Sequence, residues 1–109
     1  MTRVLIVDNE PSILSVLSTL LKAEGFDVMA TREGKKAQDT IRAEHFDLMI
    51  TDIRMQPVDG MQLLKTARME APTMAVIMLT AYGSVESAIE AMKLGAFDYV
   101  AKPFKLDEI

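Results

Sequence analysis

Residues that could carry out phosphoryl chemistry follow four short apolar runs. In chain order they are Asp8, Asn9 and Glu10 after the first run, Asp52 just beyond the third, Thr80 after the fourth and Lys102 after the fifth. Carboxylate and amide oxygens suit Mg2+, which takes oxygen ligands and keeps several waters. One carboxylate can attack phosphorus to form an acyl phosphate. A metal ion, a lysine and a hydroxyl can stabilise the phosphoryl oxygens. The set therefore predicts a magnesium-assisted phosphoryl site.

The five apolar runs are interpreted as the strands that must bring these residues together. They cover residues 4–7, 28–30, 48–50, 75–79 and 99–101. Three of them are almost wholly apolar, which is typical of strands covered on both faces of a parallel sheet. Ligands of such sheets bind beyond the carboxyl ends of the strands. The residues that follow the runs are therefore expected to converge at one edge of the sheet.

Four helical patterns separate the predicted strands, so we expect an α/β protein built from right-handed βαβ units. The first helix has Pro11 in its first turn and Gly25 at its end. The second covers residues 34–44, the third starts near Gly60, and Ser84 is expected to cap the fourth. The fourth helix carries an apolar stripe that is predicted to face inward, formed by Val85, Ala88, Ile89 and Met92.

The chain ends soon after the fifth predicted strand. Residues 105–109 have the pattern of the first turn of a fifth helix. A sheet covered on both faces would need that helix. We therefore expect one domain over residues 1–109, truncated at the start of its last helix or covering the gap by self-association.

Composition excludes several other kinds of site. The 109 residues are 50% hydrophobic and 26% charged, which fits one globular domain. The absence of cysteine excludes disulfides and thiolate zinc sites, and the single histidine, His45, excludes a multi-histidine metal site. A net charge of -4 argues against direct nucleic-acid binding by this domain. No apolar run reaches the length of a signal-peptide core or a membrane span, so a cytoplasmic location is expected.

Each candidate residue also has an ordinary structural interpretation when taken alone. Asp8 could cap a helix, and Asp52 could belong to a turn. Thr80 alone is more often a cap or loop residue, and Lys102 alone is more often a solvated surface residue. The phosphoryl interpretation depends on all four standing at strand ends together.

At this point the chain resembles the CheY-like response regulator receiver family. The resemblance is carried by four motifs in order, VLIVDNE, DLMITDIRMQPVDG, VIMLTAYG and FDYVAKPF, and covers nearly the whole chain. The stretch AYGSVESAIEAMKLGAFDYVAKPF is most similar to receivers of NtrC-type regulators. The resemblance implies a doubly wound, flavodoxin-like parallel sheet of five strands in the order 2-1-3-4-5, with the fifth helix largely absent.

The resemblance also implies a role for each site residue. Asp52 is then the phosphoacceptor, and Lys102 and Thr80 contact the phosphoryl group. Tyr99 is the aromatic switch residue that turns inward when Thr80 moves. The magnesium site is formed by Asp8, Asn9, Asp52 and the backbone carbonyl of Arg54, with Glu10 as a further candidate. The family most often has Asp where this chain has Asn9, so we expect weaker magnesium binding and slower phosphorylation.

The function implied is a two-component switch. A sensor histidine kinase phosphorylates Asp52 with the help of Mg2+, and the surface around the fourth helix and fifth strand changes to control an output. Beyond this self-phosphotransfer and autodephosphorylation no enzymatic activity is expected. The resemblance also implies other partners, which are an ATPase and a DNA-binding domain in a longer parent chain, and a second copy of the chain in a homodimer. It does not imply binding to a membrane.

The residues leave three alternative functions open. A receiver that no longer accepts phosphate could serve as a docking module, an interpretation that Asn9 keeps open. A haloacid-dehalogenase-like phosphatase would use Asp8 as its nucleophile, with Glu10 where a second Asp belongs. A flavodoxin-type cofactor binder would need a phosphate-cradling loop where the chain has Asp8-Asn9-Glu10, and these acidic groups would repel phosphate.

Overall fold

Strands and helices alternate along the chain, as the apolar runs predict. The computed structural model describes residues 2–53, 59–80 and 85–101. The elements, in order, are β1 (Arg3–Val7), α1 (Pro11–Ala23), β2 (Asp27–Thr31), α2 (Gly34–Ala43), β3 (Leu48–Asp52), α3 (Gly60–Glu70), β4 (Ala75–Thr80), α4 (Val85–Lys93) and β5 (Asp98–Ala101). In the described part of the chain, no helix is long and apolar enough to cross a membrane. The expected fifth helix falls on residues outside the described ones.

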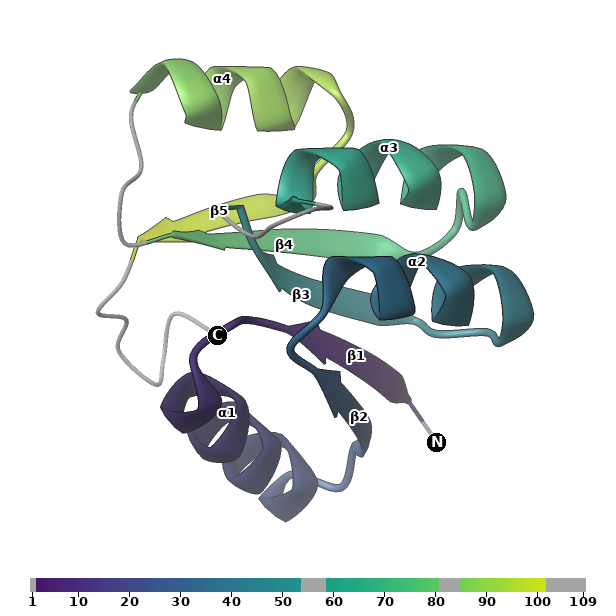
Figure 1. The fold of residues 1–109 in the computed structure, drawn as a ribbon, viewed down its shortest axis with the longest axis vertical. Coiled ribbons are helices and arrows are strands. Elements are labelled where there is room, and N and C mark those ends of the chain that lie inside the picture. The colour runs from purple at the N-terminus through teal and green to yellow at the C-terminus, as the bar shows by residue number, and fades with distance from the viewer. Residues whose placement is uncertain (1, 54–58, 81–84, 102–109) are drawn as a thin grey trace.

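The five strands form one parallel sheet in the order β2-β1-β3-β4-β5 (Figure 1). This confirms both the predicted fold class and the strand order. The central strands β1, β3 and β4 are buried almost throughout, which explains their continuous apolar runs. The edge strand β2 is largely exposed and has a mixed sequence.

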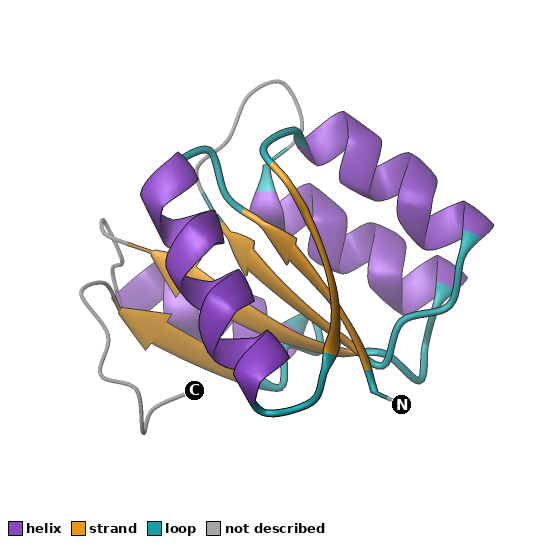
Figure 2. Ribbon diagram, turned by 90° about the horizontal axis from the view of Figure 1, so that it is seen from below, coloured by secondary structure: helices purple, strands orange, loops and turns teal. Residues whose placement is uncertain are grey.

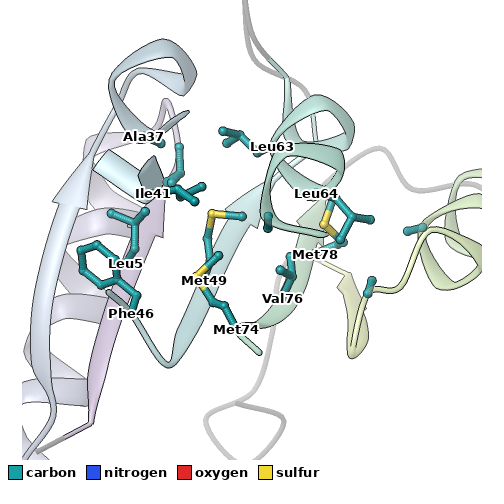
Figure 3. Packing of buried hydrophobic residues seen from close by; sticks show 14 residues of the cluster. Leu5, Ala37, Ile41, Phe46, Met49, Leu63, Leu64, Met74, Val76 and Met78 are labelled. Carbon is teal, nitrogen blue, oxygen red and sulfur yellow. The ribbon is translucent and has the colours of Figure 1, made fainter. Parts of the chain in front are cut away.

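Helices cover both faces of the sheet. Figure 2 shows α1 lying alone across one face, with α2 and α3 on the other. Alternate residues of β1 point to opposite faces, so Val4 and Ile6 join the core with Leu17 of α1, whereas Leu5 and Val7 join the core beneath α2, α3 and α4. In the second core, shown in Figure 3, Met49 and Met78 project from the sheet toward α2 and α3.

The buried face of α4 differs from the prediction. Ile89 and Met92 were expected to point inward, but they are 49% and 48% exposed. Among the described side chains of α4, which begin at Ile89, that of Ala91 is the buried one, at 0% exposure. The helix lies at the end of its layer, against β5, and a small residue there lets it approach the sheet closely. The predicted positions of Val85 and Ala88 concern side chains outside the description, as does the Ser84 cap.

A capping box starts α3. Asp59 accepts a hydrogen bond from the Gln62 backbone N–H at 2.9 Å, and the Gln62 side chain accepts one from the Asp59 N–H at 3.0 Å. The Gly60 N–H next to it donates to the Ile53 carbonyl at 2.8 Å. The first turn of α3 is thereby joined to the end of β3.

Replacing Asp59 by alanine is expected to destabilise the protein by about 1 kcal/mol, because the first turn loses its side-chain acceptor. The urea midpoint of unfolding, followed by circular dichroism, measures this loss. Asp39→Ala is the matched control, because Asp39 makes only an exposed pair with Lys35 at 3.1 Å, worth a few tenths of a kcal/mol. Equal losses in the two variants would contradict a capping role.

A network of polar side chains lies at the amino-terminal edge of the sheet. The Asp47 carboxylate accepts the Arg3 backbone N–H at 2.9 Å and lies 3.3 Å from His45 Nε2. Arg3 also pairs with Glu44 at 3.0 Å, and its guanidinium stacks over the Phe46 ring. The Arg3 N–H, and then His45, hold the pKa of Asp47 below its ordinary value.

Asp47 should therefore add a pH-dependent contribution to stability. A depressed carboxyl pKa gives stability that is present above the unfolded pKa, near about 4, and is lost as the pH falls through the folded value. We expect the stability of the wild type to fall more steeply below about pH 4 than that of Asp47→Asn, whose amide oxygen still accepts the Arg3 N–H. Urea unfolding at a series of pH values tests this, and parallel curves would refute it.

Candidate functional site

Two carboxylates stand side by side at the carboxyl end of the sheet. Val7 of β1 pairs with Thr51 of β3, so the residues that follow them, Asp8 and Asp52, occupy neighbouring positions. Adjacent strands lie about 4.8 Å apart. Asp52 in turn pairs with Leu79 of β4, one residue before Thr80. The structure thus brings together the ends of β1, β3 and β4 that the sequence predicts to converge.

Both carboxylates are withdrawn from solvent. Asp8 is 0% exposed and Asp52 is 6% exposed. The Asp8 Oδ1 atom accepts the Glu10 backbone N–H at 2.9 Å, which fixes the turn into α1. Carboxylates brought this close repel each other when both are charged, and a cation that binds both offsets that repulsion, so the pair has the character of a site for a hard metal ion.

Asn9 and Glu10 follow Asp8 in the chain and are exposed. The Asn9 carbonyl accepts a long hydrogen bond of 3.5 Å from Arg32 Nη2, and Glu10 precedes α1 without capping it through its side chain. Among the described residues, no group of three or more acidic, histidine or cysteine side chains is arranged to hold a metal. The described acidic centre is therefore the pair Asp8 and Asp52.

The remaining predicted site residues are described only in part. Thr80 ends β4 opposite Ala101, the last residue of β5, whereas the Thr80 side chain, Lys102 and Arg54 lie outside the description. Tyr99 is half-buried against the core beneath α2, α3 and α4. Its hydroxyl is buried and has no hydrogen-bond partner within residues 2–53, 59–80 and 85–101, and burial raises the pKa of Tyr99. The switch role of Tyr99 stays a prediction.

Local hydrogen bonds hold the end of β3 in place. The Ile53 N–H donates to the Leu79 carbonyl at 3.2 Å, and the Thr51 hydroxyl donates to the Asp52 carbonyl at 3.0 Å. Gly60 lies so close that a Cβ atom built on it would overlap the Asp52 carbonyl oxygen and approach Ile53 Cα to 2.8 Å. The sequence predicts a helix start near Gly60 but not this contact, because nothing local in the sequence indicates which backbone atoms a glycine will meet.

The comparisons with known proteins all point to one family. The family model of the response regulator receiver domain matches residues 4–109. The regulatory protein AtoC of Escherichia coli K12 is 43% identical over 107 residues, which are 98% of this chain and 23% of AtoC. The chain thus spans about a quarter of this relative.

Solved structures of the same fold extend the likeness. A CheY-like receiver domain protein from Methanospirillum hungatei has a TM-score of 0.94 at 31% identity, covering 99% of this chain and 86% of that one. The beryllofluoride-activated NtrC4 receiver domain dimer has a TM-score of 0.93 at 34% identity, and the match covers 99% of this chain and 89% of that one. A response regulator from Burkholderia pseudomallei, solved with a phosphorylated aspartic acid and a calcium ion, has a TM-score of 0.92 at 25% identity. The match covers 99% of this chain and 64% of that one.

Proposed function

Because the chain belongs to the response regulator receiver domain family, we propose that it is a phosphorylation switch in which Asp52 accepts the phosphoryl group. The observation that carries this proposal is the buried pair of carboxylates at the adjacent ends of β1 and β3. Asp52 is the member of the pair at the centre of the sheet, between β1 and β4. Thr80 and Lys102 are the residues proposed to contact the phosphoryl group there.

The donor set fits Mg2+. We propose that Asp8, Asp52, the Asn9 amide and the Arg54 carbonyl hold the ion, with Glu10 as a further ligand. All of these are oxygen donors, and the exposed side of the site leaves room for the waters that magnesium keeps. When bound, the ion supplies charge neutralisation at the phosphoryl oxygens. The calcium ion named for the Burkholderia pseudomallei protein shows that a related receiver accepts a hard divalent cation.

The transfer itself is a displacement at phosphorus. A carboxylate oxygen of Asp52 forms the new P–O bond while the N–P bond to the phosphorylated histidine of a sensor kinase breaks, and the electron pair returns to the imidazole nitrogen. Lys102 and the Thr80 hydroxyl then bind the phosphoryl oxygens. Tyr99 is the proposed aromatic switch residue. Its hydroxyl is already buried beside the core in this structure, and a rearrangement coupled to Thr80 would alter the surface of α4 and β5. The cycle ends with autodephosphorylation, so no separate substrate is turned over.

The output is proposed to be transcriptional. AtoC, a regulatory protein, is about four times as long as the segment it shares with this chain, so a longer parent chain with an ATPase and a DNA-binding domain would fit. The NtrC4 receiver is a dimer in its activated form, and a phosphorylation-dependent homodimer is the corresponding proposal here. A cytoplasmic location follows from a histidine-kinase partner.

Intact mass spectrometry after incubation with acetyl phosphate tests the function. We expect one added phosphoryl group in the presence of Mg2+ and none after chelation. A folded chain that gains no phosphoryl group under conditions that label an ordinary receiver would favour a docking module. Steady hydrolysis of phosphomonoesters that is lost in Asp8→Asn but kept in Asp52→Asn would favour a phosphatase.

Replacing Asn9 by aspartate is expected to tighten Mg2+ binding by about tenfold, because a third carboxylate joins Asp8 and Asp52. Without metal the same variant should be less stable, because the added charge increases the repulsion. Thermal unfolding at increasing Mg2+ concentration reports both effects. Asn9→Ala serves as the control and should not tighten binding, whereas equal affinity in Asn9→Asp and the wild type would refute the prediction.

A further inference from the structure

A hollow of about 520 Å³ opens beside the carboxylate pair, and the phosphorylation mechanism does not use it. One wall comes from the loop after β1 and from α1, through Asn9 and Leu14. The other wall runs from the end of β2 into the first turn of α2 and consists of Ala30, Thr31, Arg32, Glu33 and Lys36. The volume of the hollow lies within the range of about 300–1,000 Å³ that is usual for small-molecule sites.

The side chains that line the hollow carry more positive than negative charge, although the chain as a whole carries a net charge of -4. Arg32 and Lys36 both line it, and neither makes an ion pair within the described part of the chain. Glu33 supplies the one carboxylate of the lining, so the sum is one positive charge. Lys35 differs: it does not line the hollow, and Asp39 neutralises it at 3.1 Å.

The lining also has an apolar part and a fixed backbone. Leu14 is half-buried and Ala30 is exposed, so together they offer a small nonpolar surface next to the two cations. The Thr31 hydroxyl accepts the Glu33 backbone N–H at 3.2 Å, which holds the turn that carries Arg32.

We propose that this hollow binds a small organic phosphate, with the phosphate on Arg32 and Lys36 and the carbon body against Leu14 and Ala30. Arg32 and Lys36 offer two positive charges to a phosphate dianion, of which Glu33 offsets one, and the guanidinium fork of arginine matches the geometry of phosphate oxygens. Nucleic acid would need a wider basic surface than two side chains within an acidic chain. The two cations lie outside the proposed phosphoacceptor site, and Asn9 is the residue that the two sites share.

The ligand would act on the neighbouring site through Arg32. Its Nη2 atom reaches the Asn9 carbonyl at 3.5 Å, and a phosphate that binds the same guanidinium competes for that contact. Asn9 follows Asp8 directly, so losing the Arg32 contact would alter the position of the loop that carries the proposed metal ligands. Because linkage is reciprocal, metal binding would alter the affinity for the organic phosphate by the same factor.

The test is an amide NMR titration of the metal-free protein at constant ionic strength, with propyl phosphate and inorganic phosphate as probes. We expect saturable shifts at Asn9, Thr31 and Lys36, and tighter binding of propyl phosphate than of inorganic phosphate. Arg32→Gln and Lys36→Gln should each weaken binding by about tenfold, as expected for the loss of one charge-assisted contact. Lys35→Gln, the matched control, should leave the affinity unchanged.

Three results would overturn the proposal: equal shifts with sodium chloride, equal weakening in Lys35→Gln and Lys36→Gln, or propyl phosphate binding no more tightly than inorganic phosphate. Circular dichroism establishes that each variant is folded. Lys36→Gln keeps the test decisive should Arg32→Gln disturb the loop at Asn9. Because no phosphodonor and no metal are present, failure here is separate from failure of phosphorylation at Asp52.

Discussion

Asp52→Asn will gain no phosphoryl group from acetyl phosphate, because an amide oxygen is a poor nucleophile toward phosphorus. Asp52 is buried and lies next to Asp8 at the end of the sheet, so the substitution removes one of the two buried carboxylates there. Intact mass measures the loss of the adduct, and urea unfolding in EDTA gives the metal-free stability of each variant.

Magnesium provides a further measurement on the same variant. Any ligand that binds only the folded chain stabilises it according to its concentration and affinity. The wild type should therefore gain stability with added Mg2+, and Asp52→Asn should lose most of that gain because one of two carboxylates is gone. Asp39→Asn, which changes an exposed aspartate on α2, should behave as the wild type in all three assays. An adduct on Asp52→Asn would assign the phosphoacceptor to another residue.

Gly60→Ala is expected to cost about 3 kcal/mol of stability, the second large effect. The new methyl group would overlap the Asp52 carbonyl oxygen and stand 2.8 Å from Ile53 Cα. Backbone atoms in a central strand have little room to yield, so either α3 moves away from the sheet or the end of β3 shifts. In both cases the Asp52 carboxylate changes position relative to Asp8, and phosphorylation by acetyl phosphate should slow.

Gly25→Ala separates this steric effect from the conformational freedom of glycine. Gly25 follows α1 with φ at 93°, and among the described residues other than Gly25 and its two chain neighbours no atom lies within 4 Å of a Cβ built there. Its substitution should cost about 1 kcal/mol through backbone strain alone and should leave the phosphorylation rate unchanged. Urea unfolding and the rate of mass increase measure both variants. A Gly60→Ala loss no larger than that of Gly25→Ala would contradict the close contact with Asp52.

The order of elements and the core of the sheet could be predicted from the sequence alone. The run from Val4 to Val7 is apolar at every position because β1 is covered on both faces, and such a run has few other interpretations. Once parallel strands are accepted, Asp8 and Asp52 must reach the same edge, because both stand at the carboxyl ends of predicted strands. This part was predictable because strand periodicity and chain direction are local properties.

Only the tertiary structure decided the contacts between segments that are distant in the chain. The stripe of Ile89 and Met92 has the spacing of a buried face, yet the position of α4 at the end of its layer turns Ala91 toward the core instead. The same holds for Gly60 against Asp52 and for Arg32 at the Asn9 carbonyl. A helical pattern limits which residues share a face, but the angle at which the helix packs on the sheet determines which face is buried. That angle depends on all its neighbours together, so no single segment of the sequence contains it.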